Sequence, residues 1–227
     1  MWPGLARIVI YVLIVTLPVW LTTWLGEKSG GFLIDVGRNL ALVSFMILII
    51  QFLIAARVKW IERAFGLDIL IRFHKYIALS AAFFLLLHPL LLALGGMGWK
   101  LLIGLKLPWY IWVGKAALIL VLANVLVATY QERLGLSFEK WRLGHDVLAP
   151  VILLGIFLHS WFAGDDLELF SMQVLWAGAL VLAVSIFVYH RFLRPNNLGK
   201  NPYQVQEVIQ ESEDVWTVCL VPPQGQS

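Results

Sequence analysis

The chain has 227 residues, of which 60% are hydrophobic and only 14% are charged, and its formal net charge is +3. A mean hydropathy of +0.83 excludes an ordinary soluble domain and indicates that lipid surrounds most of the chain. Its Lys and Arg residues lie between apolar runs rather than in a basic patch, which argues against nucleic-acid binding. Because Cys219 is the single cysteine, an internal disulfide, a cysteine-ligated cluster and a Cys-x-x-Cys-His haem attachment site are excluded.

Long apolar runs predict six transmembrane helices, at residues 6–26, 33–56, 72–95, 109–130, 145–163 and 172–192. Each is close to the ~20 residues that a helix needs to span about 30 Å of hydrocarbon. Stretches such as Tyr76–Trp99 contain no Asp, Glu, Lys or Arg and lack the alternation of barrel strands. The first run follows Arg7 without a small-x-small cleavage site after it, which favours an uncleaved helix over a secretion signal. The expected fold class is an all-α membrane protein, a bundle of six transmembrane helices.

The Lys and Arg residues favour one side of this bundle. One set of loops and the tail carry Arg57, Lys59, Arg63, Arg72, Arg133, Lys140, Arg142, Arg191, Arg194 and Lys200. The opposite loops carry Lys28, Lys100 and Lys106, and the last of them holds Asp165, Asp166 and Glu168. By the positive-inside rule, both termini of this multi-pass protein are expected in the cytoplasm. The third and fifth spans then both run outward.

The sequence changes character after Arg194-Pro195. Apolar and polar residues alternate over Tyr203–Ile209 and Val215–Val221, with a turn predicted at Glu211–Asp214, which is typical of an antiparallel hairpin. Two strands alone are marginally stable in water. We therefore expect a membrane domain at residues 1–194, and we expect residues 195–227 to begin a second, truncated cytoplasmic domain or to dock on another protein.

Four of the five histidines form two equally spaced pairs in the sequence. His74 and His88 are fourteen residues apart in the third span, and His145 and His159 are fourteen residues apart in the fifth. Fourteen helical residues rotate by about 1400°, roughly 40° short of four turns, and rise about 21 Å. Each pair therefore shares one helix face, with its members near opposite edges of the hydrocarbon layer. Facing spans would bring His74 level with His145, and His88 level with His159.

A flat cofactor with two axial positions fits each of these two sites. Imidazole is a good axial ligand of haem iron, and no carboxylate or thiolate lies near enough in sequence to complete a zinc or copper site. The spacing thus predicts two non-covalent b-type haems, with all four histidines as iron ligands. The alternative is a non-redox transporter or scaffold in which the histidines are structural or relay protons.

These residues give the chain a resemblance to a known family. The two His-x13-His motifs and Gly37-Arg38-Asn39-Leu40 resemble the ferric reductase-like transmembrane domain shared by NADPH oxidases, metalloreductases and related bacterial haem proteins, over residues 30–193. The tail looks like the first strands of the ferredoxin-reductase type flavin domain that follows this domain in those families. In the oxidases an arginine at the like position lies beside the outer haem, which makes Arg38 the candidate catalytic residue.

The resemblance implies electron transfer from a reduced flavin to an extracytoplasmic acceptor through the two haems. FAD and NAD(P)H would belong to a downstream flavin reductase domain, in cis or in trans, and the acceptor would be oxygen or a ferric chelate. An alternative within the superfamily is a haem subunit that passes electrons to a separate periplasmic reductase. Two positions depart from the oxidases: Leu92 replaces a further histidine, and Val151-Ile152 replace a bridging aromatic residue, for which Phe83 or Phe84 could substitute.

Several charged residues allow both a functional and a structural interpretation. Arg38 is expected to meet a haem propionate or an anionic acceptor, or to reach the interface as an anchor. Arg72 and Lys75 flank His74 and are candidates for the propionates of the inner haem, or are inner-leaflet anchors. The acidic loop at Asp165–Glu168 could attract a cation, although a solvated loop is the simpler interpretation. His190 has no partner at the ligand spacing and is not included in the site.

Overall fold

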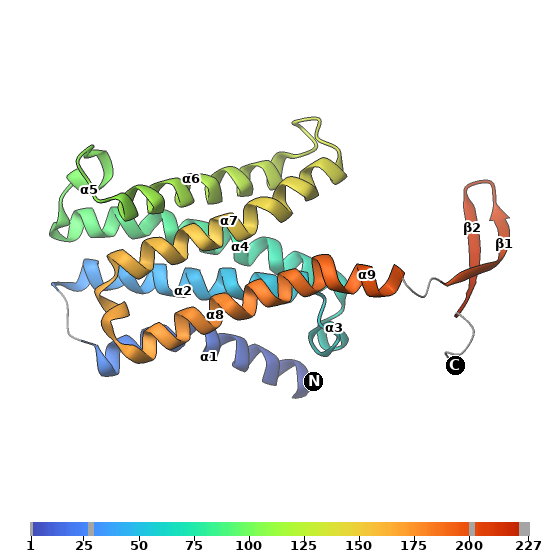
Figure 1. The fold of residues 1–227 in the computed structure, drawn as a ribbon, viewed down its shortest axis with the longest axis horizontal. Helices are drawn as coiled ribbons and strands as arrows, with labels where there is room; N and C mark the ends of the chain where they lie inside the picture. Colours follow the sequence, from blue (N-terminus) through green and yellow to red (C-terminus); the bar gives the residue numbers. More distant parts are fainter. Residues whose placement is uncertain (1, 27–29, 200–202, 223–227) are drawn as a thin grey trace. The chain divides into compact units, whose positions relative to one another are not determined.

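The computed structural model describes residues 2–26, 30–199 and 203–222 of a mostly helical chain that also contains one hairpin (Figure 1). It divides into two compact units, residues 1–184 and 185–227. Lys28 and Lys200, which contribute to the predicted charge bias, lie outside the described residues.

Within the described residues, six helices are long and apolar enough to cross a membrane, which confirms the predicted number of spans. They are α1 (Trp2–Leu25), α2 (Phe32–Ala55), α4 (Leu67–Leu92), α6 (Trp109–Tyr130), α7 (Phe138–Ala163) and α8 (Phe170–Val188). Shorter elements complete the helical part: α3 (Lys59–Phe65), the π-helical turns η1 (Ala93–Met97) and η3 (Tyr189–Leu193), α5 (Lys100–Ile103), the 3-10 turn η2 (Asp165–Glu168) and α9 (Arg194–Gly199).

Two of the long helices begin five or more residues earlier than the hydropathy predicts. Helix α4 begins at Leu67 rather than residue 72, and α7 begins at Phe138 rather than residue 145. The hydroxyl of Ser137 accepts a hydrogen bond from the backbone N–H of Lys140, which caps α7, so its first turns are helical although they carry charged residues. Hydropathy marks the apolar part of a helix and misses such polar turns. His74 and His145 consequently lie about two turns inside their helices.

The two histidine-bearing helices, α4 and α7, are each supported by a neighbour. Helix α2 packs along α4 and α6 packs along α7, while α4 also contacts α6 and α2 also contacts α7 (Figure 1). Phe45 of α2 and Trp176 of α8 stack with their ring centroids 4.4 Å apart, and each is 1% exposed. This arrangement holds α4 and α7 in fixed positions around a buried apolar interior.

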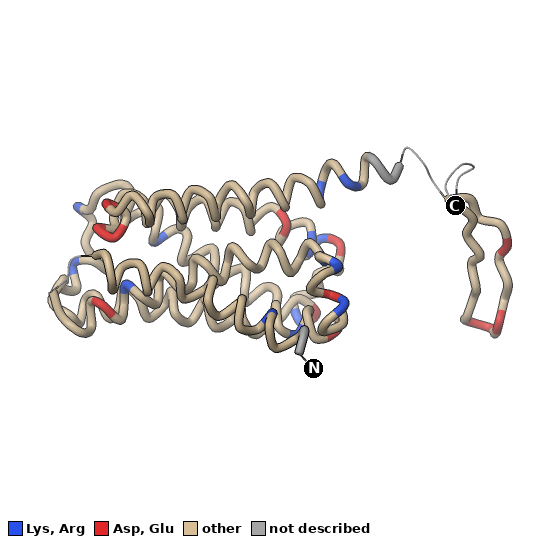
Figure 2. Tube along the Cα trace, turned by 90° about the horizontal axis from the view of Figure 1, so that it is seen from below, with Lys and Arg blue, Asp and Glu red and all other residues tan. Residues whose placement is uncertain are grey.

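The outer surface of the helical unit fits a lipid environment. Large apolar side chains such as Ile119 on α6 and Val181 on α8 are more than half exposed, which would be costly in water. Figure 2 shows that the charged residues of this unit lie mainly toward the ends of the helices. The chain is accordingly a multi-pass membrane protein.

The second unit contains the predicted hairpin. Strands β1 (Gln204–Ser212) and β2 (Val215–Val221) pair antiparallel, with Val208 opposite Val218, which confirms the hairpin. Strand β1 extends beyond the predicted Ile209, so the turn is shorter than predicted and contains only Glu213 and Asp214. Every residue of β1 is exposed, so the two strands have no core of their own.

Candidate cofactor site

The structure brings the four predicted histidines together as two facing pairs. The ring centroids of His74 on α4 and His145 on α7 are 6.3 Å apart, and we call these residues the His74 pair. The ring centroids of His88 on α4 and His159 on α7 are 6.5 Å apart, and we call these residues the His88 pair. Helices α4 and α7 therefore run in the same direction with their histidine faces opposed, as the equal spacing predicts.

The separation within each pair fits one metal ion between two imidazoles. With metal–nitrogen bonds of about 2.0–2.1 Å and each ring centre roughly 1.1 Å beyond its nitrogen, two imidazoles on opposite sides of one metal ion would have centroids roughly 6.2–6.4 Å apart. The observed values are 6.3 and 6.5 Å. Among the described residues no group of three or more His, Cys, Asp or Glu could hold a metal ion, so each pair could provide only two protein ligands. A haem iron can take two axial ligands from the protein, which matches two histidines per site.

Hydrogen bonds at Nδ1 orient three of the four imidazoles. Nδ1 of His88 donates to the carbonyl oxygen of Gly37 at 2.9 Å, and Nδ1 of His159 donates to that of Tyr110 at 2.9 Å. Nδ1 of His145 lies 3.2 Å from Oδ1 of Asn124. Because a carbonyl oxygen can only accept, the proton of each imidazole is on Nδ1. The Nε2 lone pair is then available to a metal, as in other histidine metal sites.

The fourth imidazole differs from the other three. Nδ1 of His74 is buried and has no hydrogen-bond partner, and Oε1 of Gln51 is also buried without a partner. The Nε2 atom of the same Gln51 donates a 3.0 Å hydrogen bond to the backbone carbonyl of His74. Gln51 is 7% exposed. It is a polar residue beside the site that the sequence analysis missed.

Gly114 of α6 makes room for the imidazole of His159. A Cβ atom at this position would lie 2.5 Å from Nδ1 and 2.6 Å from Cγ of His159, which is closer than real atoms approach. The ring can therefore lie against the helix backbone and reach the carbonyl of Tyr110 because residue 114 is a glycine. Gly37 plays a similar part on α2, where the helix lies close to His88. A Cβ at this position would lie 3.2 Å from the carbonyl oxygen of His88.

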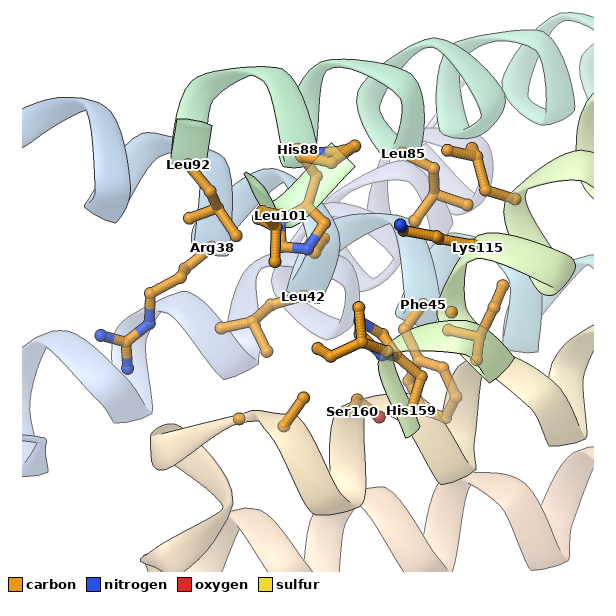
Figure 3. A pocket seen from close by; sticks show the side chains of 18 of the residues that line it. Arg38, Leu42, Phe45, Leu85, His88, Leu92, Leu101, Lys115, His159 and Ser160 are labelled. Carbon is orange, nitrogen blue, oxygen red and sulfur yellow. The ribbon is translucent and has the colours of Figure 1, made fainter. Parts of the chain in front are cut away.

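A largely apolar cavity of about 460 Å³ opens beside the His88 pair (Figure 3). Its size falls within the range of about 300–1,000 Å³ that is typical of small-molecule and cofactor sites. Besides the two histidines, its lining includes Phe45, Leu85 and Trp176 and two basic residues, Arg38 and Lys115. It therefore combines metal-ligating imidazoles with apolar walls and a small number of charges.

Arg38, the candidate catalytic residue, is paired with a carboxylate of the acidic loop. Its Nε donates to Oδ2 of Asp166 at 3.0 Å, and its Nη2 bonds Oδ1 of the same residue. The two side chains are 18% and 13% exposed. The expectation of a solvated acidic loop is therefore wrong for Asp166, because η2 turns this side chain against α2, and correct for Asp165 and Glu168, which are exposed.

Lys115 of α6 is a second basic residue of this cavity, and the sequence analysis missed it. Its Nζ donates to the carbonyl oxygen of Leu102 at 2.8 Å and lies 4.6 Å from the centroid of the Trp112 ring. A single lysine within an apolar run carries little information in sequence. Only the fold shows that it lines the same cavity as His88 and His159.

Among the described residues, the other charged candidates form no hydrogen bond or ion pair with the two histidine pairs. Arg72 and Lys75 are both exposed, and Nε of Arg72 makes a long 3.4 Å bond to the backbone oxygen of Asp68; their role toward a propionate stays a prediction. His190 lies in η3 at 3.5 Å from a guanidinium nitrogen of Arg194.

Neither predicted substitute for a bridging aromatic residue lines the cavity beside the His88 pair. Phe83 is 56% exposed, while Phe84 is partly buried against the apolar cluster that contains Ile50 and Ala81. The buried aromatic side chains of the cavity are instead Phe45 of α2 and Trp176 of α8.

Comparison with known proteins relates the chain to a protein family and to an archaeal protein. Residues 40–156, just over half of the chain, match the family described as "Ferric reductase like transmembrane component". This stretch contains His74, His88 and His145 and ends three residues before His159. The chain is also 25% identical over 175 residues to an uncharacterized protein of Archaeoglobus fulgidus, covering 71% of this chain and 93% of that protein. The chain therefore belongs to the ferric reductase like transmembrane component family, which places it among the membrane oxidoreductases that transfer electrons across a bilayer.

Proposed function

We propose that this protein carries electrons across the cell membrane through two b-type haems, one held by the His74 pair and the other by the His88 pair. The observation that supports this most directly is the separation of the imidazoles, 6.3 and 6.5 Å between centroids, which would leave room for one metal ion between the two histidines of each pair. Bound haem would supply the one-electron chemistry.

The residues of the chain would hold, orient and insulate the two groups. Acceptors at Gly37, Tyr110 and Asn124 keep Nδ1 protonated, so that Nε2 can ligate iron. Apolar side chains such as Phe45 and Trp176 would exclude water from the His88 level and keep the local dielectric low. Ligand orientation and burial are the means by which a protein sets a haem potential.

The proposed direction of transfer is from the cytoplasm outward. The Lys and Arg bias supports cytoplasmic termini, which would put the His74 pair on the cytoplasmic side. The donor would be a reduced FAD, supplied by NAD(P)H, in a flavin domain that residues 195–227 would begin, or in a separate protein. The acceptor, oxygen or a ferric chelate, would be reduced beside the His88 pair, next to Arg38.

A haem assay of the purified protein tests this function. After expression with sufficient haem, the full chain should contain two non-covalent haems per chain and show a low-spin bis-histidine spectrum. A protein without a Soret band would instead favour the transporter or scaffold interpretation, in which the histidines relay protons.

Two further measurements test the direction and the donor. Reporters fused after Ser227 and within residues 164–169 should label the cytoplasmic and the outer side, respectively. Reduction of both haems by NAD(P)H through an added flavin reductase domain would support the proposed donor. Reduction only by a quinol, with transfer to a separate periplasmic protein, would favour the alternative haem subunit.

A further inference from the structure

We propose that Lys115 is a carboxylate-binding residue that holds a propionate of the haem at the His88 pair. This inference rests on the proposed function. The cavity beside that pair has a mainly apolar lining that contains two basic side chains, Arg38 and Lys115, and two carboxylates, Asp165 and Asp166.

The two cations differ in what balances them. Arg38 is neutralised by the two-point contact with Asp166. Lys115 makes only neutral contacts among the described residues, with the Leu102 carbonyl and the Trp112 ring. An ammonium group in a membrane span is costly unless an anion accompanies it. Asp165, the other carboxylate of the lining, is exposed and forms no ion pair with Lys115. Among the described residues Lys115 therefore lacks an anionic partner within salt-bridge distance.

The position of Lys115 in the cavity favours an anion carried by the bound group. In Figure 3 its ammonium group extends into the space beside His88, whereas the guanidinium of Arg38 points away from that space. An anion at Lys115 therefore shares the cavity with whatever the two imidazoles hold. A carboxylate is the anionic group of haem, and a charge-assisted bond to an ammonium would anchor it.

Haem release from the full-length protein tests this assignment. Transfer to excess apomyoglobin should proceed in two phases, and the phase that disappears in His88→Ala belongs to the His88 pair. Lys115→Met should speed that phase about tenfold, because one charge-assisted hydrogen bond is lost, and should leave the other phase unchanged. Lys115→Arg should release haem nearly as slowly as the wild type. Lys106→Met, which removes an exposed lysine of a nearby loop, is the matched control.

The same assay with haem dimethyl ester tests whether a propionate is the group that Lys115 holds. Lys115→Met should not speed the release of the ester, which has no carboxylate. Equal acceleration of haem and ester would overturn the proposal and assign Lys115 a structural role. Unchanged haem release combined with slower reoxidation by ferric citrate, but not by oxygen, would overturn it in favour of a site for the carboxylate of the acceptor.

We propose, from a separate observation, that Gln51 is the positioning residue of His74 and that its Oε1 accepts a hydrogen bond from Nδ1 of His74 when a metal is bound. The hydrogen-bond partners of the histidines repeat their spacing: Tyr110 and Asn124 on α6 are fourteen residues apart, like His145 and His159 on α7. On α2, the residue fourteen positions after Gly37, the partner of His88, is Gln51. The antiparallel pairing of α2 with α4 puts Gln51 at the level of His74, where its Nε2 already bonds the His74 carbonyl.

Two buried atoms at this contact lack hydrogen-bond partners. Nδ1 of His74 and Oε1 of Gln51 are both buried without a partner, and such groups cost free energy until they are satisfied. One is a donor in the tautomer that ligates through Nε2, and the other is an acceptor. A bond between them would orient His74 as the other three imidazoles are oriented.

The midpoint potential of the haem at the His74 pair tests this role. A hydrogen bond from Nδ1 makes the imidazole a stronger donor to iron and favours the oxidised state. Gln51→Leu should therefore raise this potential, as Asn124→Leu should, whereas Gln51→Glu keeps acceptor oxygens in place and should not raise it. Ser44→Ala, which removes another buried polar side chain of α2, is the control. Equal shifts in Gln51→Leu and Ser44→Ala, a rise in Gln51→Glu, or no shift in Gln51→Leu would overturn the proposal.

Discussion

The His74 pair and the His88 pair each contain two imidazoles at nearly the same separation, but their surroundings differ. Both imidazoles of the His88 pair donate to backbone carbonyls, of Gly37 and Tyr110. In the His74 pair, His145 donates to the side chain of Asn124, and the group beside His74 is the side chain of Gln51. A backbone acceptor cannot be removed by substitution, whereas a side-chain acceptor can. The two levels should therefore respond to different mutations.

The largest expected effect is the loss of one haem without the other. His88→Ala or His159→Ala should reduce the haem content from two to one per chain, because one axial ligand alone holds b-type haem weakly and each pair is separate. His74→Ala or His145→Ala should remove the other haem. A pyridine haemochrome assay with a potentiometric titration measures which one remains. Loss of both haems in every variant would show that the two levels are not independent.

The next largest effect is expected from the close packing of Gly114 against His159 in the His88 pair. Gly114→Ala should cause the loss of most of the haem at the His88 pair, since the new methyl group would lie 2.5 Å from Nδ1 of His159 and would displace the ring from the Tyr110 carbonyl. Gly178→Ala is the matched control, because a Cβ at this α8 position meets nothing within 4 Å; it should be neutral or stabilise the helix by up to about 1 kcal/mol. Haem retention equal in the two variants would contradict the importance of this contact.

The sequence predicted the features that follow from spacing and hydropathy. Six apolar runs and equal intervals between His74 and His88 and between His145 and His159 suffice to predict the helices and the two facing pairs, because helix periodicity determines which residues share a face. The helix starts were less accurate, since charged first turns are helical but not apolar.

The surroundings of the histidines could not be predicted in the same way. The partners of the His88 pair are backbone atoms of Gly37 and Tyr110, which no side-chain pattern reveals. Asn124 and Gln51 could have been found, because each is an amide within an apolar run, but which histidine each would face depends on how the helices pack. The pairing of Arg38 with Asp166 joins residues 128 positions apart, and only the fold brings them together.

The ion pair at the His88 level should produce a smaller effect, on kinetics rather than haem content. Asp166→Asn leaves the guanidinium of Arg38 without its counter-charge, so reoxidation of the reduced protein by anionic ferric citrate should become about threefold faster at low salt. Arg38→Gln should slow this reaction, and Asp165→Asn, at the exposed neighbour, is the control. Slower reoxidation in both Asp166→Asn and Arg38→Gln would mean that the pair is needed to hold η2 against α2.

The smallest effect is expected at the His74 pair, from Arg72 and Lys75. Both side chains are exposed, and an exposed ion pair contributes about 0–1 kcal/mol because water and salt screen it. Neutralising both residues, as Arg72→Gln with Lys75→Gln, should therefore speed haem release from the His74 pair by less than about fivefold, and 0.5 M salt should produce a similar change in the wild type. Lys59→Gln with Arg63→Gln, also exposed but on α3, controls for the general loss of positive charge. An acceleration of tenfold or more that salt does not reproduce would show that the two residues bind propionates directly and turn inward when haem is present. In that case both histidine pairs would have a basic residue that binds a haem propionate, as proposed for Lys115. The two pairs would then differ only in the hydrogen bonds that orient their imidazoles.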